Sequence, residues 1–251
     1  DSSCFGFPVS FVDESLANGD SIISWNWDFG DGSLSGVEAP EHTYATSGTF
    51  QVTLTVENNF GCSNTATQPH YVNPLPAVDF TFTNGCLGTI TQFTSQASSP
   101  VGIETYFWDF DDGTTSNASN PNYTYATSGT YDVKLIVTDF FGCSDSITHT
   151  VEVFESPVAA FEAPAVCLGD STHFTDLTAP AGALWNWSFG DGGSSTLSDP
   201  AHLYANAGTY SVLLEVEDVN GCSSSIVQEV TVNPLPIVAF TWNFAACAGD
   251  T

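Results

Sequence analysis

Residues 25–62 read WNWDFGDGSLSGVEAPEHTYATSGTFQVTLTVENNFGC, and the same pattern returns at 106–143 and 185–222. The second copy begins 81 residues after the first (106 − 25), and the third begins 79 residues after the second (185 − 106). Solenoid repeats are only about 20–50 residues long, so each copy is expected to form a small domain of its own.

Short segments of each copy alternate apolar and polar residues and are bounded by Gly, Pro, Asn, Asp or Ser, which is typical of β-strands with one buried face. In the third copy these segments are 157–161, 171–177, 184–189, 210–216 and 226–232. Asn220-Gly221 predicts a hairpin because both residues tolerate a positive φ. The pattern therefore predicts an all-β chain of tandem immunoglobulin-like β-sandwich domains in a linear array.

The motif Trp-x-Trp-Asp-Phe-Gly-Asp-Gly at 25–32 is followed by Pro40, His42, Tyr44 and the segment 48–56. This combination resembles the PKD domain, and all three copies match it over their full length. The copies depart from the motif at Tyr106, Asp111 and Ser188. No single carboxylate of the motif is therefore indispensable. The resemblance implies a spacer, adhesion or fibre role and no catalytic activity.

The repeat phase predicts four sections of the chain. Residues 1–73 form a repeat that lacks its first strand, 74–154 and 155–233 form complete repeats, and 234–251 form the first strand of a further repeat. Together with the Pro-Leu-Pro linkers and the cysteines, this organisation resembles the long PKD arrays of secreted surface proteins and gliding adhesins in bacteria that use type IX secretion. We therefore expect a piece of a longer array.

The chain has 29 acidic residues and a single basic one, Lys134, which gives a net charge of −28. Nucleic acids and anionic lipid surfaces require clustered Lys and Arg, so binding to either is excluded. No window of about 18 apolar residues is present, so no membrane insertion is expected. An acidic chain that offers trypsin one cleavage site fits an extracellular or cell-surface protein.

Seven cysteines occupy two fixed phases of the repeat, without a Cys-x-x-Cys pair, which predicts disulfides rather than a zinc site. One phase holds Cys4, Cys86, Cys167 and Cys247, and the other holds Cys62, Cys143 and Cys222. Pairing within a repeat would give Cys4–Cys62, Cys86–Cys143 and Cys167–Cys222.

The two phases are expected at opposite ends of a sandwich about 25–30 Å long, whereas a disulfide requires Cα atoms within about 7 Å. The favoured alternative therefore joins successive repeats through Cys4–Cys143 and Cys86–Cys222. It leaves Cys62, Cys167 and Cys247 for other domains. Bonds within repeats remain the open alternative.

Calcium is the one cofactor to consider, because the motif places several carboxylates at one turn. The candidate ligands are Asp28, Asp31, Asp109, Asp112 and Asp191. The competing interpretation is that these side chains accept hydrogen bonds from the N–H groups of their own turn. Carboxylates near the linkers, Asp79, Glu155 and Glu162, are a second possible calcium site.

No catalytic residues are assigned. His42 and His202 share a repeat phase in which the second copy has Tyr123, so the position requires a half-buried ring rather than an imidazole base. Trp27, Trp108 and Trp187 are expected in the core. Trp25 and its counterparts are expected to be exposed, where they offer a hypothetical platform for surface glycans.

Glycosylation is a further hypothesis. Asn117 and Asn122 fit the N-glycosylation pattern. Ser21, Ser146 and Ser171 resemble the Asp-Ser-apolar O-glycosylation signal of the same bacteria. All these signals are short.

The sequence thus predicts a structural segment of an extracellular fibre or adhesin stalk built from disulfide-stapled tandem PKD domains, with further copies of the repeat as partners in the same chain or in neighbouring subunits. The alternative is a calcium-dependent or glycan-binding accessory module of a secreted enzyme or adhesin.

Overall fold

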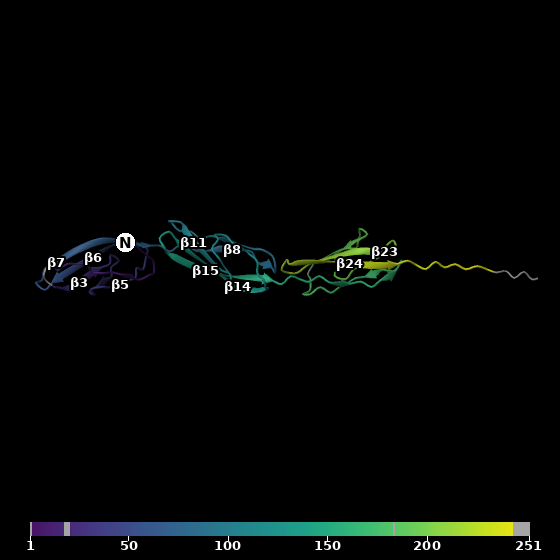
Figure 1. Ribbon diagram of the computed structural model, residues 1–251, viewed down its shortest axis with the longest axis horizontal. Helices are drawn as coiled ribbons and strands as arrows, with labels where there is room; N and C mark the ends of the chain where they lie inside the picture. Colours follow the sequence, from purple (N-terminus) through teal and green to yellow (C-terminus); the bar gives the residue numbers. More distant parts are fainter. Residues whose placement is uncertain (1, 18–20, 183, 243–251) are drawn as a thin grey trace, which may run out of the picture. The chain divides into compact units, whose positions relative to one another are not determined.

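The computed structural model describes residues 2–17, 21–182 and 184–242, and within these ranges it contains strands and no helix. Accordingly, this part of the chain has no helix long and apolar enough to cross a membrane. The residues divide into two compact units, one holding the first repeat and most of the second, the other holding the third repeat together with 85–89 and 125–129 of the second. Figure 1 labels some of the strands of each repeat.

The first repeat consists of β1 (Ser2–Cys4), β2 (Val9–Ser10), β3 (Ile22–Asp28), β4 (Leu34–Ser35), β5 (Glu41–His42), β6 (Gly48–Asn58) and β7 (Ser63–Asn73). One sheet has the order β1-β7-β6-β3-β4, and β2 and β5 pair as a second sheet. The long hairpin of β6 and β7 is the centre of the larger sheet (Figure 1).

The second repeat consists of β8 (Phe80–Phe82), β9 (Gly85–Cys86), β10 (Thr91–Ser95), β11 (Ile103–Asp109), β12 (Thr115–Ser116), β13 (Asn122–Tyr123), β14 (Gly129–Asp139) and β15 (Ser144–Phe154). Its larger sheet has the order β12-β11-β14-β15-β9, and its smaller sheet the order β13-β10-β8.

The third repeat consists of β16 (Phe161–Glu162), β17 (Val166–Cys167), β18 (Thr172–His173), β19 (Thr175–Asp176), β20 (Leu184–Ser188), β21 (Ser194–Ser195), β22 (Ala201–His202), β23 (Gly208–Glu217) and β24 (Ser223–Asn233). Its larger sheet has the order β17-β24-β23-β20-β21, and β16-β19 and β18-β22 form two small paired sheets. The same order of five strands in the larger sheet therefore occurs in each repeat, which confirms the predicted tandem immunoglobulin-like sandwiches.

The core of each sandwich is built around the second Trp of the motif. Trp27, Trp108 and Trp187 are 6%, 0% and 0% exposed, as predicted. Each packs against Phe rings from the smaller sheets or the residues next to them; in the third repeat the rings of Phe161 and Phe174 lie 5.1 and 5.3 Å from that of Trp187. Burying an aromatic side chain of this size supplies much of the stability of a small domain.

The prediction for the first Trp of the motif is wrong. Side chains two positions apart in a strand point to the same face, so Trp25 shares the inward face of β3 with Trp27. Trp25 and Trp185 are half-buried against the core. The indole N–H of Trp25 donates to Asp13 Oδ2 at 2.7 Å, and that of Trp185 donates to Asp176 Oδ2 at 2.7 Å. These rings are therefore not an exposed platform for sugars.

The hairpin between β23 and β24 is present, but its turn differs from the expected Asn-Gly turn. Glu217 pairs with Ser223, so the loop holds five residues. Gly221 has a φ of 82°, whereas Asn220 is not among the described residues with a positive φ. The side chain of Asp218 closes the loop instead, by accepting the N–H groups of Asn220 and Cys222.

Residues 234–242, expected to begin a further repeat, contain no strand, and 243–251 lie outside the described residues. The equivalent strand of the second repeat, β8, pairs with β10 of its own sandwich. The first strand of a repeat therefore forms by pairing with a strand that comes later in the same repeat.

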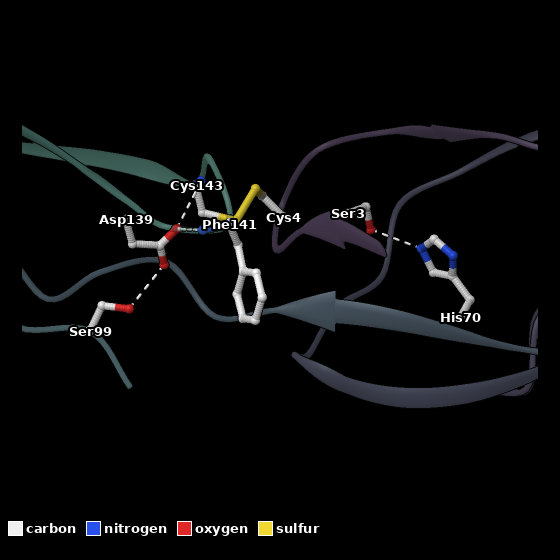
Figure 2. Close-up of a disulfide and its surroundings, with 7 residues drawn as sticks. All are labelled: Ser3, Cys4, His70, Ser99, Asp139, Phe141 and Cys143. Carbon is white, nitrogen blue, oxygen red and sulfur yellow. Dashed lines mark hydrogen bonds between the residues drawn. A yellow bond between two sulfur atoms is a disulfide. The ribbon is translucent and has the colours of Figure 1, made fainter. Parts of the chain in front are cut away.

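One core position differs in polarity between the repeats. His70 on β7 is 6% exposed, and the equivalent residues on β15 and β24 are Val151 and Val230. His70 Nε2 lies 2.9 Å from Ser3 Oγ (Figure 2), and the ring stacks on Tyr44. Burial lowers the pKa of His70 from its ordinary value of 6.5, because the folded state disfavours the charged ring.

We predict that the first repeat loses stability as the pH falls below about 6.5, because the unfolded state then binds a proton that the folded state resists. His70→Val, which copies the other repeats, removes this pH dependence. Hydrogen exchange of 48–73, corrected for intrinsic rates and compared between pH 5 and 7, measures the effect. His173→Gln is the control, because His173 is exposed. Unchanged pH dependence in His70→Val would contradict the prediction.

Candidate functional site

Two disulfides join residues of successive repeats. Cys4 and Cys143 form one with an S–S distance of 2.02 Å, and Cys86 and Cys222 form the other with 2.00 Å; the Cα atoms are 5.5 Å apart in both. The structure thus brings together the pairs that the sequence analysis favours over pairs within a repeat. Cys62 and Cys167 are free, and Cys247 lies outside the described residues.

One partner of each bond lies in a leading segment, which we define as 2–7, 85–89 and 166–170. Its cysteine ends a short strand that runs parallel to the last strand of the same repeat, and Cys4 aligns with Asn73, Cys86 with Phe154 and Cys167 with Asn233. The next residue donates its N–H to the carbonyl of the aligned residue at 2.8 Å in all three repeats.

The other partner lies in a tip loop, which we define as 58–62, 139–143 and 218–222, between the two longest strands of each repeat. Asp139 is 1% exposed, and its Oδ1 accepts the N–H groups of Phe141 and Cys143 at 2.9 and 3.0 Å. Its Oδ2 accepts the hydroxyl of Ser99 at 2.9 Å (Figure 2). These three hydrogen bonds offset the cost of burying the carboxylate and fix the position of Cys143.

The leading segment and the tip loop of one repeat lie at opposite ends of its last strand. Asn73, the residue that Cys4 aligns with in the sheet, ends β7. Cys62 directly precedes Ser63, which begins β7. Eleven residues at about 3.3 Å each separate the two cysteines by about 35 Å. A disulfide within the repeat would require Cα atoms within about 7 Å. The topology therefore favours bonds between repeats.

The motif carboxylates form a second, separate feature, in which an Asp of the turn binds a ring of the opposite sheet. Asp31 Oδ1 accepts the N–H of Ser33, and its Oδ2 lies 2.7 Å from His42 Nε2. The His42 ring stacks on Phe29, with centroids 4.2 Å apart and planes at 6°. We call this arrangement of Asp, ring and Phe the Asp–ring clasp.

The other repeats contain the same clasp. In the third, Asp191 Oδ2 lies 2.8 Å from His202 Nε2, and in the second the Tyr123 hydroxyl donates to Asp112 Oδ2. His and Tyr are interchangeable here because each presents a flat ring with a polar atom at its far end. The hydrogen bond from His202 lowers the pKa of Asp191 below its ordinary value of 3.8.

The first Asp of the motif also bonds to its own turn. Asp28 Oδ1 accepts the N–H of Gly30, and Asp109 Oδ1 accepts that of Asp111. Near the linkers, Asp79 Oδ1 lies 2.8 Å from His149 Nε2. Within the described ranges no three His, Cys, Asp or Glu side chains group as a metal site. The contacts match the interpretation of these residues as acceptors of hydrogen bonds from their own turns.

The five candidate glycosylation residues are all exposed: Asn117, Asn122, Ser21, Ser146 and Ser171. Asn122 lies on β13 and Ser146 on β15, and the other three lie outside the named strands.

A family model described as PKD domain matches residues 2–73, 71–154 and 155–233. The pre-pro-metalloprotease PrtV of Vibrio cholerae serotype O1 is 30% identical over 152 residues, which are 59% of this chain and 16% of that protein. A microbial collagenase of Vibrio alginolyticus is 41% identical over 71 residues, 28% of this chain and 9% of that protein. The chain thus matches less than a fifth of the length of either relative.

Among solved structures, the PKD1 domain of the Vibrio cholerae metalloprotease PrtV is 32% identical, with a TM-score of 0.30, and the match covers 32% of this chain and 98% of that domain. The PKD1 domain of Vibrio anguillarum Epp is 27% identical, with a TM-score of 0.32, and the match covers 33% of this chain and 98% of that domain.

We predict that calcium does not stabilise the chain, because the motif carboxylates already accept hydrogen bonds. Thermal unfolding in millimolar calcium and in EDTA should give the same Tm. A ligand at about 100 times its Kd would add about 2.7 kcal/mol, which raises the Tm of a small domain by about 10–20 °C. Asp191→Ala should lower the stability by about 1 kcal/mol in both buffers through loss of the clasp. A saturable rise of Tm with calcium that Asp191→Ala abolishes would contradict this prediction.

Proposed function

The chain belongs to the PKD-domain family, and on that premise we propose that it is a load-bearing structural segment of an extracellular fibre or adhesin stalk. The observation that supports this role most strongly is the pattern of the two disulfides, since each connects one repeat to the next. Such bonds keep neighbouring repeats joined when the chain is pulled, as a segment under tension requires.

The disulfide pattern places three stretches of chain in parallel. The bonds Cys4–Cys143 and Cys86–Cys222 act as two fixed points, and residues 4–86, 86–143 and 143–222 each run from one point to the other. Tension that enters at Cys4 and leaves at Cys222 is therefore shared by all three stretches. Unfolding one stretch alone does not freely lengthen the span from Cys4 to Cys222, because the other two stretches still hold the same two points.

The surface chemistry supports a passive role. Four histidines make structural contacts: His42 and His202 bind clasp carboxylates, His149 bonds to Asp79, and His70 bonds to Ser3. His42 and His70 lie in the first repeat on either side of the Tyr44 ring, and His149 and His202 lie in the second and third repeats. We therefore propose that the chain has no catalytic activity of its own. The near absence of Lys and Arg suits an exposed location, because trypsin-like proteases require these residues.

A second candidate function is that of an accessory module beside an enzyme domain. The observation that favours it is the identity of the matched relatives, a metalloprotease and a collagenase, in which the matched part is a small share of the protein. In that role the array would carry a ligand-binding surface, for calcium or glycans. The half-buried, hydrogen-bonded indoles of Trp25 and Trp185 make the tryptophan platform a poor candidate for that surface.

Force spectroscopy tests the load-bearing role. The shortest stretch between the two disulfides, 86–143, has 57 residues (143 − 86), so at about 3.4 Å per residue we predict a maximum span of about 190 Å between Cys4 and Cys222. Reduction should release all 218 residues (222 − 4), about 740 Å. Cys86→Ser is the matched control, which leaves the 79 residues of 143–222 (222 − 143) and a span of about 270 Å. An oxidised chain that lengthens as far as the reduced one would contradict the proposal.

Electron microscopy of the native, unreduced material separates the two candidate functions. A structural segment predicts continuous filaments or long threads with an axial repeat near a multiple of about 30–45 Å, the length of one sandwich plus linker. A few repeats attached to a compact catalytic domain would instead establish the accessory role.

A further inference from the structure

The dipeptide Asp-Gly occurs three times in the chain, at 31–32, 112–113 and 191–192. Each copy lies in the motif turn, and its Asp supplies the carboxylate of the Asp–ring clasp. An Asp followed by Gly isomerises more readily than an Asp followed by other residues, because glycine has no side chain to obstruct the attack of its nitrogen on the carboxyl carbon. Each repeat therefore carries the same chemically labile dipeptide at the same place.

The fold of the turn requires both residues. The three glycines have φ values between 87° and 96°, in the left-handed region that other residues rarely adopt. The Asp is required because its two carboxylate oxygens bind different groups. Asp191 Oδ1 accepts the N–H of Gly193 at 2.9 Å, and its Oδ2 lies 2.8 Å from His202 Nε2. The labile dipeptide is thus a consequence of the turn and the clasp.

Packing around the glycine does not prevent the reaction. A Cβ atom added to Gly192 would meet no atom within 4 Å apart from its neighbours in the chain, and the same holds for Gly32 and Gly113. The side chain of Asp191 is 25% exposed, so water reaches the turn. The restraint on the Asp comes instead from its hydrogen bonds and from the ring beside it.

The ring of His202 restrains Asp191 in two ways. It stacks on Phe189, with centroids 4.2 Å apart, and this contact fixes the nitrogen that bonds to the carboxylate. It also lies over the residue that follows the dipeptide, since a Cβ atom at Gly193 would be 2.6 Å from His202 Cε1. Attack by the Gly192 nitrogen requires the carboxyl group to rotate, whereas the two hydrogen bonds hold both of its oxygens.

We propose that Asp31, Asp112 and Asp191 are latent sites of isoaspartate formation, and that the ring of the clasp suppresses this reaction in the folded chain. In the reaction the Gly nitrogen loses its proton and bonds to the carboxyl carbon of the Asp, and one carboxyl oxygen leaves as water. Water then cleaves either C–N bond of the resulting succinimide, which gives aspartate or isoaspartate. The water lost on ring closure is regained, so the reaction needs no oxidant or reductant.

Ionisation of the carboxyl group adds to the protection. Ring closure requires the protonated form, because a carboxylate resists attack by a nitrogen. The hydrogen bond from His202 lowers the pKa of Asp191 below its ordinary value of 3.8, which reduces the protonated fraction near neutral pH.

Isoaspartate would damage the clasp permanently. It carries the backbone through the former side chain, which lengthens the turn by one atom and moves the carboxylate away from the ring. The ring partner therefore maintains the turn chemically as well as mechanically. This role goes beyond the proposed function, since it applies whether or not the chain bears load.

Ageing of the folded, oxidised chain tests the proposal. His202→Phe keeps a ring beside Phe189 but removes the polar atom, and His202→Tyr restores one, as Tyr123 does in the second repeat. Each chain is incubated for several weeks at neutral pH and body temperature. Isoaspartate at each of the three sites is then measured by chymotryptic peptide mapping with electron-transfer fragmentation. The same chain unfolded in urea gives the unprotected rate.

In the unsubstituted folded chain, all three sites should isomerise at least tenfold more slowly than in urea. His202→Phe should raise the rate at Asp191 at least fivefold and leave the rates at Asp31 and Asp112 unchanged. His202→Tyr should return the rate at Asp191 to nearly that of the unsubstituted chain. Equal rates at Asp191 with and without His202→Phe would overturn the proposal, as would a folded chain that isomerises as fast as the unfolded one.

A further variant separates loss of the hydrogen bond from a general loss of stability. Val216 is 2% exposed and pairs with Trp185 on β20, at the end of that strand away from the motif turn. Val216→Ala should lower the Tm of the third repeat at least as much as His202→Phe does, yet leave the isomerisation rate of Asp191 unchanged. An equal rise of the rate in Val216→Ala would show that unfolding exposes the site, and the proposal would then be wrong.

Discussion

The parallel pairing of each leading segment with the last strand of its own repeat is the constraint on which the rest of the structure depends. It places one cysteine at the far end of a strand of eleven residues, while the tip loop holds the other cysteine at the near end. The two cannot meet within one sandwich. The cysteines are therefore available only to a neighbouring repeat, and every disulfide of this kind connects one domain to another.

Two sets of side-chain hydrogen bonds support this arrangement in each repeat. The Asn or Asp at the start of each tip loop accepts two backbone N–H groups and fixes the cysteine, so little conformational entropy is lost when the bond forms. The Asp–ring clasp holds the two sheets together beside the motif turn, through a carboxylate on one side and His42, Tyr123 or His202 on the other. With a single basic residue in 251, the chain has almost no Lys or Arg salt bridges to use instead.

Much of the fold follows from the sequence, because alternation and turn residues are local signals. The buried Trp27, Trp108 and Trp187 and the strands around them are predicted correctly. The hydrogen bond between Asp31 and His42 is not predicted, because a contact between the two sheets depends on how they pack. The sequence does predict that the ring at position 42 is half-buried. The wrong prediction that Trp25 is exposed has a different cause. Trp25 and Trp27 are two positions apart on β3 and share one face, whereas the prediction assigned them to opposite faces. The turn at Asn220 depends on a side-chain acceptor that a dipeptide pattern does not reveal.

The central claim is that the disulfides join successive repeats, and the single Lys residue offers a direct measurement. Trypsin cuts the denatured, unreduced and alkylated chain only after Lys134, between 1–134 and 135–251. In the Cys86→Ser variant, Cys4–Cys143 should still hold the two fragments together on a non-reducing gel. If the bonds lie within repeats, the substitution removes the only bond across the cut, and the fragments separate. Fragments that stay joined until a reductant is added support the account, and separation without a reductant would contradict it.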